Sequence, residues 1–177
     1  MSRVGKLPIV CSPGVNVKID GSLVVVRGPM GELTKNFGKL RHIKIDYSDG
    51  IIQVSVTSDE DAAMYGTVRS LINNMVQGVT VGFVKELEIE GVGYKAAVDG
   101  QYLNMQLGTS HGMKIEIEQG ITVECPKPTA ITIRGANKEQ LGRFAANIIK
   151  LRPPEPYKGK GIRLRGQYVE RKEGKKK

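Results

Sequence analysis

Two segments of the chain repeat the same order of hydrophobic and polar positions. Each begins with alternating apolar and polar residues, as in a strand with one buried face, and continues with apolar residues at helical spacing. The first segment starts at residue 54, and the second spans residues 131–151. The apolar stripes of the two expected helices are Val68, Leu71, Ile72, Met75, Val76 and Val79, and Leu141, Phe144, Ala145 and Ile148. The repeat predicts two similar units in which a helix packs this stripe against a sheet.

Turn and helix-end signals divide the remaining sequence into short strands. Asp-Gly pairs, which favour the tight turns of β-hairpins, occur at residues 20–21, 49–50 and 99–100. Gly78 is placed to end the first helix, and Pro153 forces the end of the second.

We therefore expect an α+β fold with two repeated domains, residues 1–82 and 83–177. Each domain is predicted to be a small antiparallel sheet packed by one helix. The first domain starts with a short basic arm that contains Arg3 and Lys6, and the second ends in a basic extension.

Composition adds a strong asymmetry of charge to this picture. The 177 residues are 40% apolar, which is enough for a buried core, and carry a formal net charge of +9. Residues 158–177 account for +7 of this charge, and the other 157 residues carry only +2. A nearly neutral body with a strongly basic end indicates a protein that binds a polyanion at that end.

Other compositional features narrow the class of protein. No apolar run exceeds four residues, which excludes a membrane-spanning helix. Cys11 and Cys125 lack the spacing of a disulfide framework or a zinc site. They are expected to be reduced thiols in a cytoplasmic protein.

Signatures of catalysis are weak throughout the sequence. His42 and His111 have no nucleophile motif nearby, and no lysine follows a phosphate-binding G-x-x-x-x-G pattern. The stretch GVGYKA, residues 91–96, lacks the third glycine of a dinucleotide fingerprint and is interpreted as a tight turn or bulge. Asp59-Glu60-Asp61 is expected to complement the positive end of the first helix rather than to bind a metal. We therefore expect a protein that is not an enzyme and needs no cofactor or metal.

The stretch RPPEPYKGKGIRLRG, residues 152–166, combines stiffness, an aromatic ring and positive charge. Its three prolines restrict the chain to an extended form, which lowers the entropy cost of presenting the residues after them. Tyr157 offers a stacking surface for unpaired RNA bases, and Gly159 and Gly161 leave the backbone bare for close approach to a phosphate. The candidate RNA-binding residues are Arg152, Tyr157, Lys158, Gly159, Lys160, Gly161, Arg163 and Arg165.

Two other functions remain open at this level. A basic tail can bind RNA or an anionic membrane without specificity, although this one has no amphipathic apolar face to bury in a membrane. A small phosphoryl-handling enzyme would need a metal or a base near the basic loop, and none is evident in the sequence.

The segment PEPYKGKGI, residues 154–162, closely resembles the signature of the bacterial-type ribosomal large-subunit protein L-six (L6) family. GVGYKA is similar to a second stretch typical of its bacterial members, and the resemblance covers essentially the whole chain. It implies a structural rRNA-binding protein without catalytic activity, placed near the elongation-factor site and the base of the lateral stalk. The implied partners are large-subunit rRNA and neighbouring large-subunit proteins, with no membrane and no small-molecule substrate.

In that family the second domain makes the principal rRNA contact, which implies roles for residues 157–161 of this chain. Arg163 and Arg165 are added by charge and proximity, whereas residues 167–177 lie outside the signature. We expect residues 152–165 to bind a particular rRNA fold, mainly through phosphate contacts, on a rigid second domain.

Overall fold

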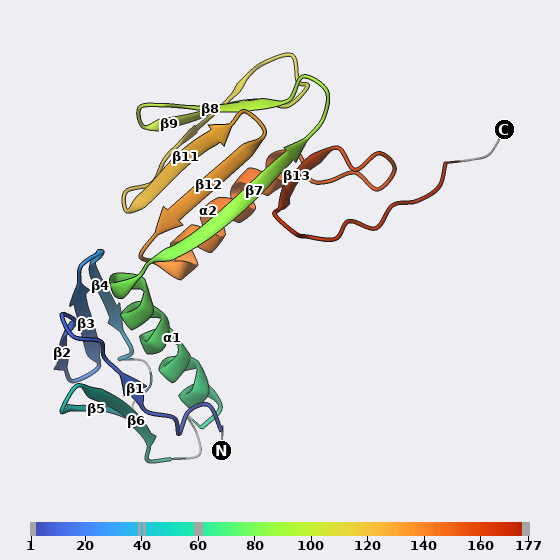
Figure 1. Ribbon diagram of the computed structural model, residues 1–177. Coiled ribbons are helices and arrows are strands. Elements are labelled where there is room, and N and C mark those ends of the chain that lie inside the picture. The colour runs from blue at the N-terminus through green and yellow to red at the C-terminus, as the bar shows by residue number, and fades with distance from the viewer. Residues whose placement is uncertain (1–2, 39, 41, 59–61, 175–177) are drawn as a thin grey trace. The chain divides into compact units, whose positions relative to one another are not determined.

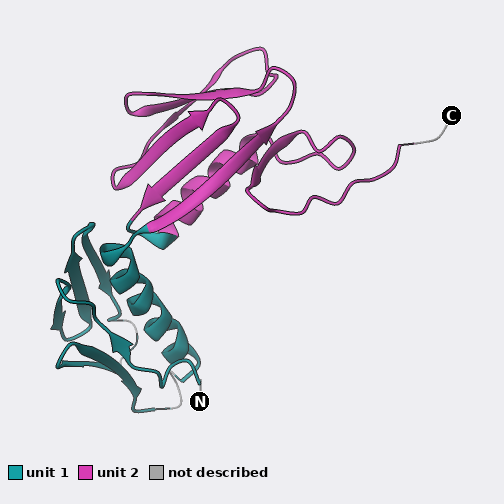
Figure 2. Ribbon diagram, viewed as in Figure 1, with its two compact units in different colours: residues 1–82, 136–138 teal, residues 83–135, 139–177 magenta. Residues whose placement is uncertain are grey.

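The chain forms two compact units in the computed structural model, which describes residues 3–38, 40, 42–58 and 62–174. The first unit comprises Met1–Gly82 with Ala136–Lys138, and the second comprises Phe83–Gly135 with Glu139–Lys177 (Figure 2). The acidic run Asp59-Glu60-Asp61, which was expected to complement the positive end of the first helix, lies outside the described residues. No helix in the described part of the chain is long and apolar enough to cross a membrane.

The described residues of the first unit form two three-stranded antiparallel sheets and one α-helix. One sheet has the order β2-β3-β4 and the other has the order β1-β6-β5. The elements are β1 (Ile9–Val10), β2 (Asn16–Asp20), β3 (Leu23–Gly28), β4 (Gly31–Asn36), β5 (Ile43–Ser48), β6 (Ile51–Val56) and α1 (Ala62–Thr80). The predicted α+β class with a helix on sheets is confirmed, and the structure adds a second sheet to the unit.

The core of the first unit lies between α1 and the two sheets. Val24 and Val26 of β3 and Ile52 of β6 are almost completely buried, and all belong to one cluster with the inner face of α1. The buried members of the predicted stripe are Val68, Ile72, Met75, Val76 and Val79, and Leu71 is half-buried at the border of this cluster. The helical spacing of these residues therefore identified the buried face correctly.

The end of α1 differs from the prediction. Gly78 lies inside the helix and is buried, and the helix continues to Thr80. The amide of Met30 donates to the carbonyl of Val79 (2.9 Å), and a Cβ on Gly28 would lie 2.6 Å from the same oxygen. This close contact with the β3–β4 hairpin holds the last turn of α1 beyond Gly78. Gly82, with a φ of 78°, then takes the left-handed conformation that ends many helices.

The second unit repeats this plan with a larger first sheet. A four-stranded antiparallel sheet has the order β11-β12-β7-β13, and a three-stranded sheet has the order β10-β9-β8. The elements are β7 (Phe83–Glu90), β8 (Lys95–Asp99), β9 (Tyr102–Gln106), β10 (Met113–Glu116), β11 (Ile121–Lys127), β12 (Ala130–Gly135), α2 (Lys138–Leu151) and β13 (Gly161–Leu164). The helix α2 covers one face of the four-stranded sheet (Figure 1).

All four predicted core residues of α2 are buried, namely Leu141, Phe144, Ala145 and Ile148. They belong to one cluster with the inward side chains of the four-stranded sheet, including Leu87 of β7, Ile133 of β12 and Ile162 of β13. The helix ends at Leu151, as Pro153 predicted. The core thus includes β13, which comes after the helix in the basic part of the chain.

The three predicted Asp-Gly hairpins are present. Residues 20–21, 49–50 and 99–100 lie at the turns that join β2 to β3, β5 to β6 and β8 to β9. At the second of these turns Asp49 and Gly50 have φ values of 51° and 76°. Two consecutive positive φ values are typical of the turn whose twist matches that of antiparallel strands.

Truncation of a core residue on α2 tests the packing of this helix against the sheet. Ile148 is 0% exposed, so we expect Ile148→Ala to lower the free energy of unfolding by about 2–5 kcal/mol, measured by urea denaturation. Asn147 is the neighbouring exposed residue, and Asn147→Ala is the matched control, with an expected change within about 0.5 kcal/mol. Equal effects of the two substitutions would contradict the assignment of Ile148 to the core.

Candidate nucleic-acid interface

The basic segment after α2 is a loop that begins at the end of the helix and ends in the edge strand β13 of the sheet. The strand β13 pairs with β7 in an antiparallel register, with Ile162 opposite Ile89. Ile162 is 0% exposed, and its amide donates to the carbonyl of Arg152 (2.8 Å). Residues 161–164 are therefore part of the sheet, whereas residues 152–165 were expected to form one presented segment. The loop proper consists of residues 152–160, which we call the basic loop.

Glu155 organises the tip of the basic loop. Its amide donates to the carbonyl of Lys160 (2.8 Å), and its own carbonyl accepts from the amide of Gly159 (3.0 Å). One carboxylate oxygen of Glu155 also accepts from the amide of Lys158 (3.3 Å). These three bonds close residues 155–160 into a turn. Tyr157 is 58% exposed and Lys158 is exposed at this turn.

The two glycines of the basic segment have a role in the fold of the loop that was not expected. Gly159 and Gly161 are both buried, with φ values of 72° and 138°. A Cβ on Gly161 would lie 2.5 Å from the carbonyl oxygen of Pro153. Gly161 therefore allows β13 to pass close to the prolines, and Gly159 uses its amide within the turn. Their backbone serves the fold of the loop, and the amide of Gly159 is already used by Glu155; a phosphate contact at these glycines stays a prediction.

The segment after β13 returns to the basic loop. The amide of Lys172 donates to the carbonyl of Pro156 (2.8 Å). The guanidinium group of Arg171 lies beside Gly159, because a Cβ on that glycine would be 3.1 Å from Nη2 of Arg171. Tyr168, between β13 and these residues, is 87% exposed. The sequence did not assign a role to Arg171 or Lys172, since each is placed beside the loop only by this return of the chain.

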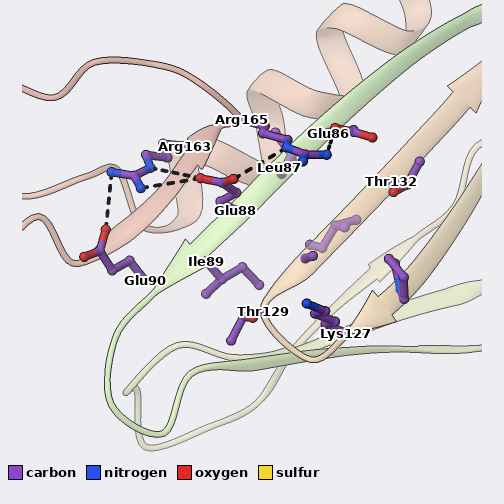
Figure 3. Close-up of a pocket in the computed structure, with 13 residues that line it drawn as sticks. Glu86, Leu87, Glu88, Ile89, Glu90, Lys127, Thr129, Thr132, Arg163 and Arg165 are labelled. Atoms are coloured by element: carbon purple, nitrogen blue, oxygen red, sulfur yellow. Dashed lines mark hydrogen bonds and ion pairs between the residues drawn. The ribbon is translucent and has the colours of Figure 1, made fainter.

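The predicted basic residues fall into two groups in the structure. Arg152, Lys158 and Lys160 take part in no ion pair with the described residues. Arg163 and Arg165, by contrast, form ion pairs with glutamates of the neighbouring strand β7 (Figure 3). The structure therefore separates the unpaired cations of the basic loop from two paired arginines, Arg163 in β13 and Arg165 directly after it.

The ion pairs of Arg163 and Arg165 lie on the face of the sheet opposite α2. Arg163 Nε is 3.4 Å from Glu88 Oε2, and Arg165 Nη1 is 2.7 Å from Glu86 Oε2 (Figure 3). The hydrogen bond that Arg165 donates to the Glu86 carboxylate raises the pKa of the Arg165 guanidinium above its usual value. These residues line a shallow depression of about 450 Å³ that also includes Lys127 and Thr132. The pair of Arg165 with Glu86 is exposed, and such ion pairs contribute little to stability by themselves.

The motifs weighed as catalytic have structural roles or no clustered partners in the described residues. Residues 91–93 form a turn, and the ring of Tyr94 fills the space beside Gly91 and Gly108, which agrees with the interpretation of GVGYKA as a tight turn. Among the described residues no three His, Cys, Asp or Glu side chains could hold a metal ion. Burial raises the pKa of the free thiols Cys11 and Cys125, which keeps them protonated at neutral pH.

Substitution of Gly161 tests the close passage of β13 and the prolines. Gly161→Ala adds both a left-handed alanine and a clash with Pro153, whereas Gly166→Ala adds only the left-handed alanine, because its φ is 78° and no atom lies within 4 Å. We expect Gly166→Ala to lower the free energy of unfolding by about 1–2 kcal/mol, and Gly161→Ala by a further 1–3 kcal/mol or so. Thermal and urea unfolding measure the stability of both variants. Equal losses of unfolding free energy would show that the close contact with Pro153 does not exclude a side chain at residue 161.

Comparison with known proteins agrees with this geometry. The family model described as "Ribosomal protein L6" matches residues 13–82 and 90–164, which include the basic loop and β13. A protein of Shouchella clausii named "Large ribosomal subunit protein uL6" is 48% identical over 177 residues, covering 99% of this chain and 98% of that protein. A protein of the same name from Halalkalibacterium halodurans is 46% identical over 175 residues, with coverage of 99% and 98%. The expected resemblance is thereby confirmed, and the chain belongs to the ribosomal protein L6 family.

Proposed function

We propose that this protein is a structural constituent of the large ribosomal subunit that binds large-subunit rRNA through its second unit. Family membership supports the ribosomal assignment, since the matched relatives are named as large-subunit proteins. The observation that carries the rRNA contact is the basic loop, which presents an exposed tyrosine and unpaired cations from a base anchored in the core. Family resemblance also supports a position near the elongation-factor site and the stalk base, beside other large-subunit proteins.

The basic loop contributes to RNA binding through its positive charge and also because its side chains are held in place before RNA binds. Arg152, Lys158 and Lys160 supply positive charge for phosphate oxygens, and the ring of Tyr157 supplies a surface on which a base or a sugar edge can stack. Because Glu155 and Ile162 fix the loop at its turn and at its base, little conformational entropy is lost when RNA binds. A preformed loop of this kind selects an RNA whose shape places phosphates around it.

The charge of the loop is tested by removing its two lysines. We expect Lys158→Gln with Lys160→Gln to weaken binding to bacterial large-subunit rRNA and to reduce the salt slope of binding by up to about 2 units, if both lysines contact phosphates. The measurement is the dissociation constant of the full chain at several salt concentrations.

The matched control removes two exposed lysines of the same unit, Lys95→Gln with Lys114→Gln, which lie on β8 and β10. This control changes the net charge equally and is expected to preserve the preference for rRNA over an unrelated structured RNA of equal length. Equal losses in both variants would point to a non-specific polyanion binder and sink the proposed loop contact. Truncation is unsuitable here, because a chain that ends at Leu151 also loses Ile162 from the core.

The ring of Tyr157 is tested separately from charge. We expect Tyr157→Ala to weaken rRNA binding by about 1–3 kcal/mol, the range of a base stacked on an aromatic ring, while the salt slope stays unchanged. Tyr157→Phe keeps the ring and is expected to retain most of the affinity. Full affinity in Tyr157→Ala would remove the tyrosine from the contact surface.

A further inference from the structure

Six charged side chains of alternating sign form a continuous row on the open face of the four-stranded sheet. We call this set the charge row, and its order is Glu86, Arg165, Glu88, Arg163, Glu90 and Arg171. Three glutamates and three arginines give it no net charge. The charge row thus contains almost half of the basic side chains that residues 152–172 carry.

Strand geometry produces the charge row. Glu86, Glu88 and Glu90 alternate with buried Leu87 and Ile89, so all three carboxylates project from the face opposite the core. The antiparallel register places Arg163 directly opposite Glu88. The amide of Arg165 donates to the carbonyl of Glu86 (2.9 Å), which extends the same pairing by one step.

Each arginine of the charge row is held by at least one carboxylate. Arg163 lies between two, with Nε 3.4 Å from Glu88 Oε2 and Nη1 3.3 Å from Glu90 Oε2. The second contact is a charge contact without hydrogen-bond geometry, because Glu90 Oε2 is buried and has no hydrogen-bond partner. Arg171 Nη2 is 3.4 Å from the other oxygen, Glu90 Oε1. Glu90 therefore joins β13 to the segment that returns to the basic loop.

The charge row changes what the basic end offers to RNA. Each of Arg163, Arg165 and Arg171 already has a carboxylate oxygen within 2.7–3.4 Å of its guanidinium group. A phosphate oxygen could not come much closer, and it would also be repelled by that carboxylate. The electrostatic attraction of these arginines for any RNA is therefore largely cancelled, and counterion release at this face is small. The unpaired Arg152, Lys158 and Lys160 of the basic loop carry the attraction instead.

We propose that Glu86, Glu88 and Glu90 are specificity-determining residues, which restrict RNA binding to the basic loop by neutralising the arginines beside it. This inference rests on the proposed rRNA-binding function and assigns to the glutamates a role in rejecting RNA of the wrong shape. An RNA that fits the loop gains its stacking and phosphate contacts, whereas an unrelated RNA finds no additional cationic surface on the sheet. Arg163, Arg165 and Arg171 are positioning residues for the loop and for the returning segment.

The test removes the three carboxylates at constant size, as Glu86→Gln, Glu88→Gln and Glu90→Gln in one full-length variant. Binding is measured against bacterial large-subunit rRNA and an unrelated structured RNA of equal length, at several salt concentrations. We expect the affinity for the unrelated RNA to rise at least about tenfold and its salt slope to steepen by about 2–3 units, as three cations become available. The affinity for rRNA rises less, so the preference for rRNA falls.

A matched variant separates the charge row from net charge. Asp99→Asn, Glu116→Gln and Glu173→Gln add the same three charges elsewhere in the second unit, at exposed carboxylates that form no ion pair with the described residues. This variant is expected to keep most of the preference for rRNA; an equal loss in both variants would overturn the proposal. A second variant adds Arg163→Gln, Arg165→Gln and Arg171→Gln to the triple glutamine variant, and it should abolish the gain for unrelated RNA. Persistence of that gain would also overturn it.

The outcome for the unaltered chain distinguishes this inference from the function on which it rests. A clear preference of the unaltered chain for rRNA that survives in the triple glutamine variant would overturn the role of the glutamates and leave the proposed function standing. No preference in the unaltered chain would overturn both. Thermal unfolding of every variant establishes that the second unit is folded under the binding conditions, so that a change in affinity reports on the charge row.

Discussion

The pairing of β13 with β7, together with the burial of Ile162, is the constraint on which the second unit depends. Pro153 prevents α2 from continuing, so the chain leaves the helix at Leu151 and must return to the sheet at Gly161. Burial of Ile162 in the cluster that contains Ile148 fixes the place of this return. Residues 152–160, which connect these two points, therefore form a loop at the edge of the sheet. Burial of Ile162 thus determines both that this loop is exposed and that its two ends are held together.

The same pairing determines how positive charge is distributed. Residues of a strand alternate between two faces, so Ile162 points into the core while Arg163 points to the open face, where β7 offers Glu88. The basic end is therefore not one uniform cationic surface. It consists of a basic loop with unpaired side chains and a neighbouring charge row that is neutral. A polyanion would experience attraction mainly at the basic loop.

The two units share a plan but differ at the end of the helix. After α1, Gly82 turns the chain directly into β7, whereas after α2 the prolines lead into the basic loop and an additional edge strand. Each unit uses its helix to cover the inner face of a sheet, and both helical stripes are buried as their spacing predicted. Because only α2 ends in the run of prolines, the basic loop belongs to the second unit alone.

Local patterns determined much of this fold from the sequence by itself. The helical stripes, the Asp-Gly hairpins and the end of α2 depend on residues within a few positions of one another, and each was predicted correctly. The presented basic segment was expected to reach residue 165, whereas the loop ends where β13 begins at Gly161. The continuation of α1 past Gly78, the burial of Gly159 and Gly161, and the partners of Arg163 and Arg165 were decided only by the tertiary structure. Glu88 and Arg163 are 75 positions apart, and the alternation of glutamates at residues 86–90 was the one signal that could have indicated their pairing. Sequence periodicity shows which face of a strand a charge occupies, but only the packing of distant strands decides which opposite charge lies beside it.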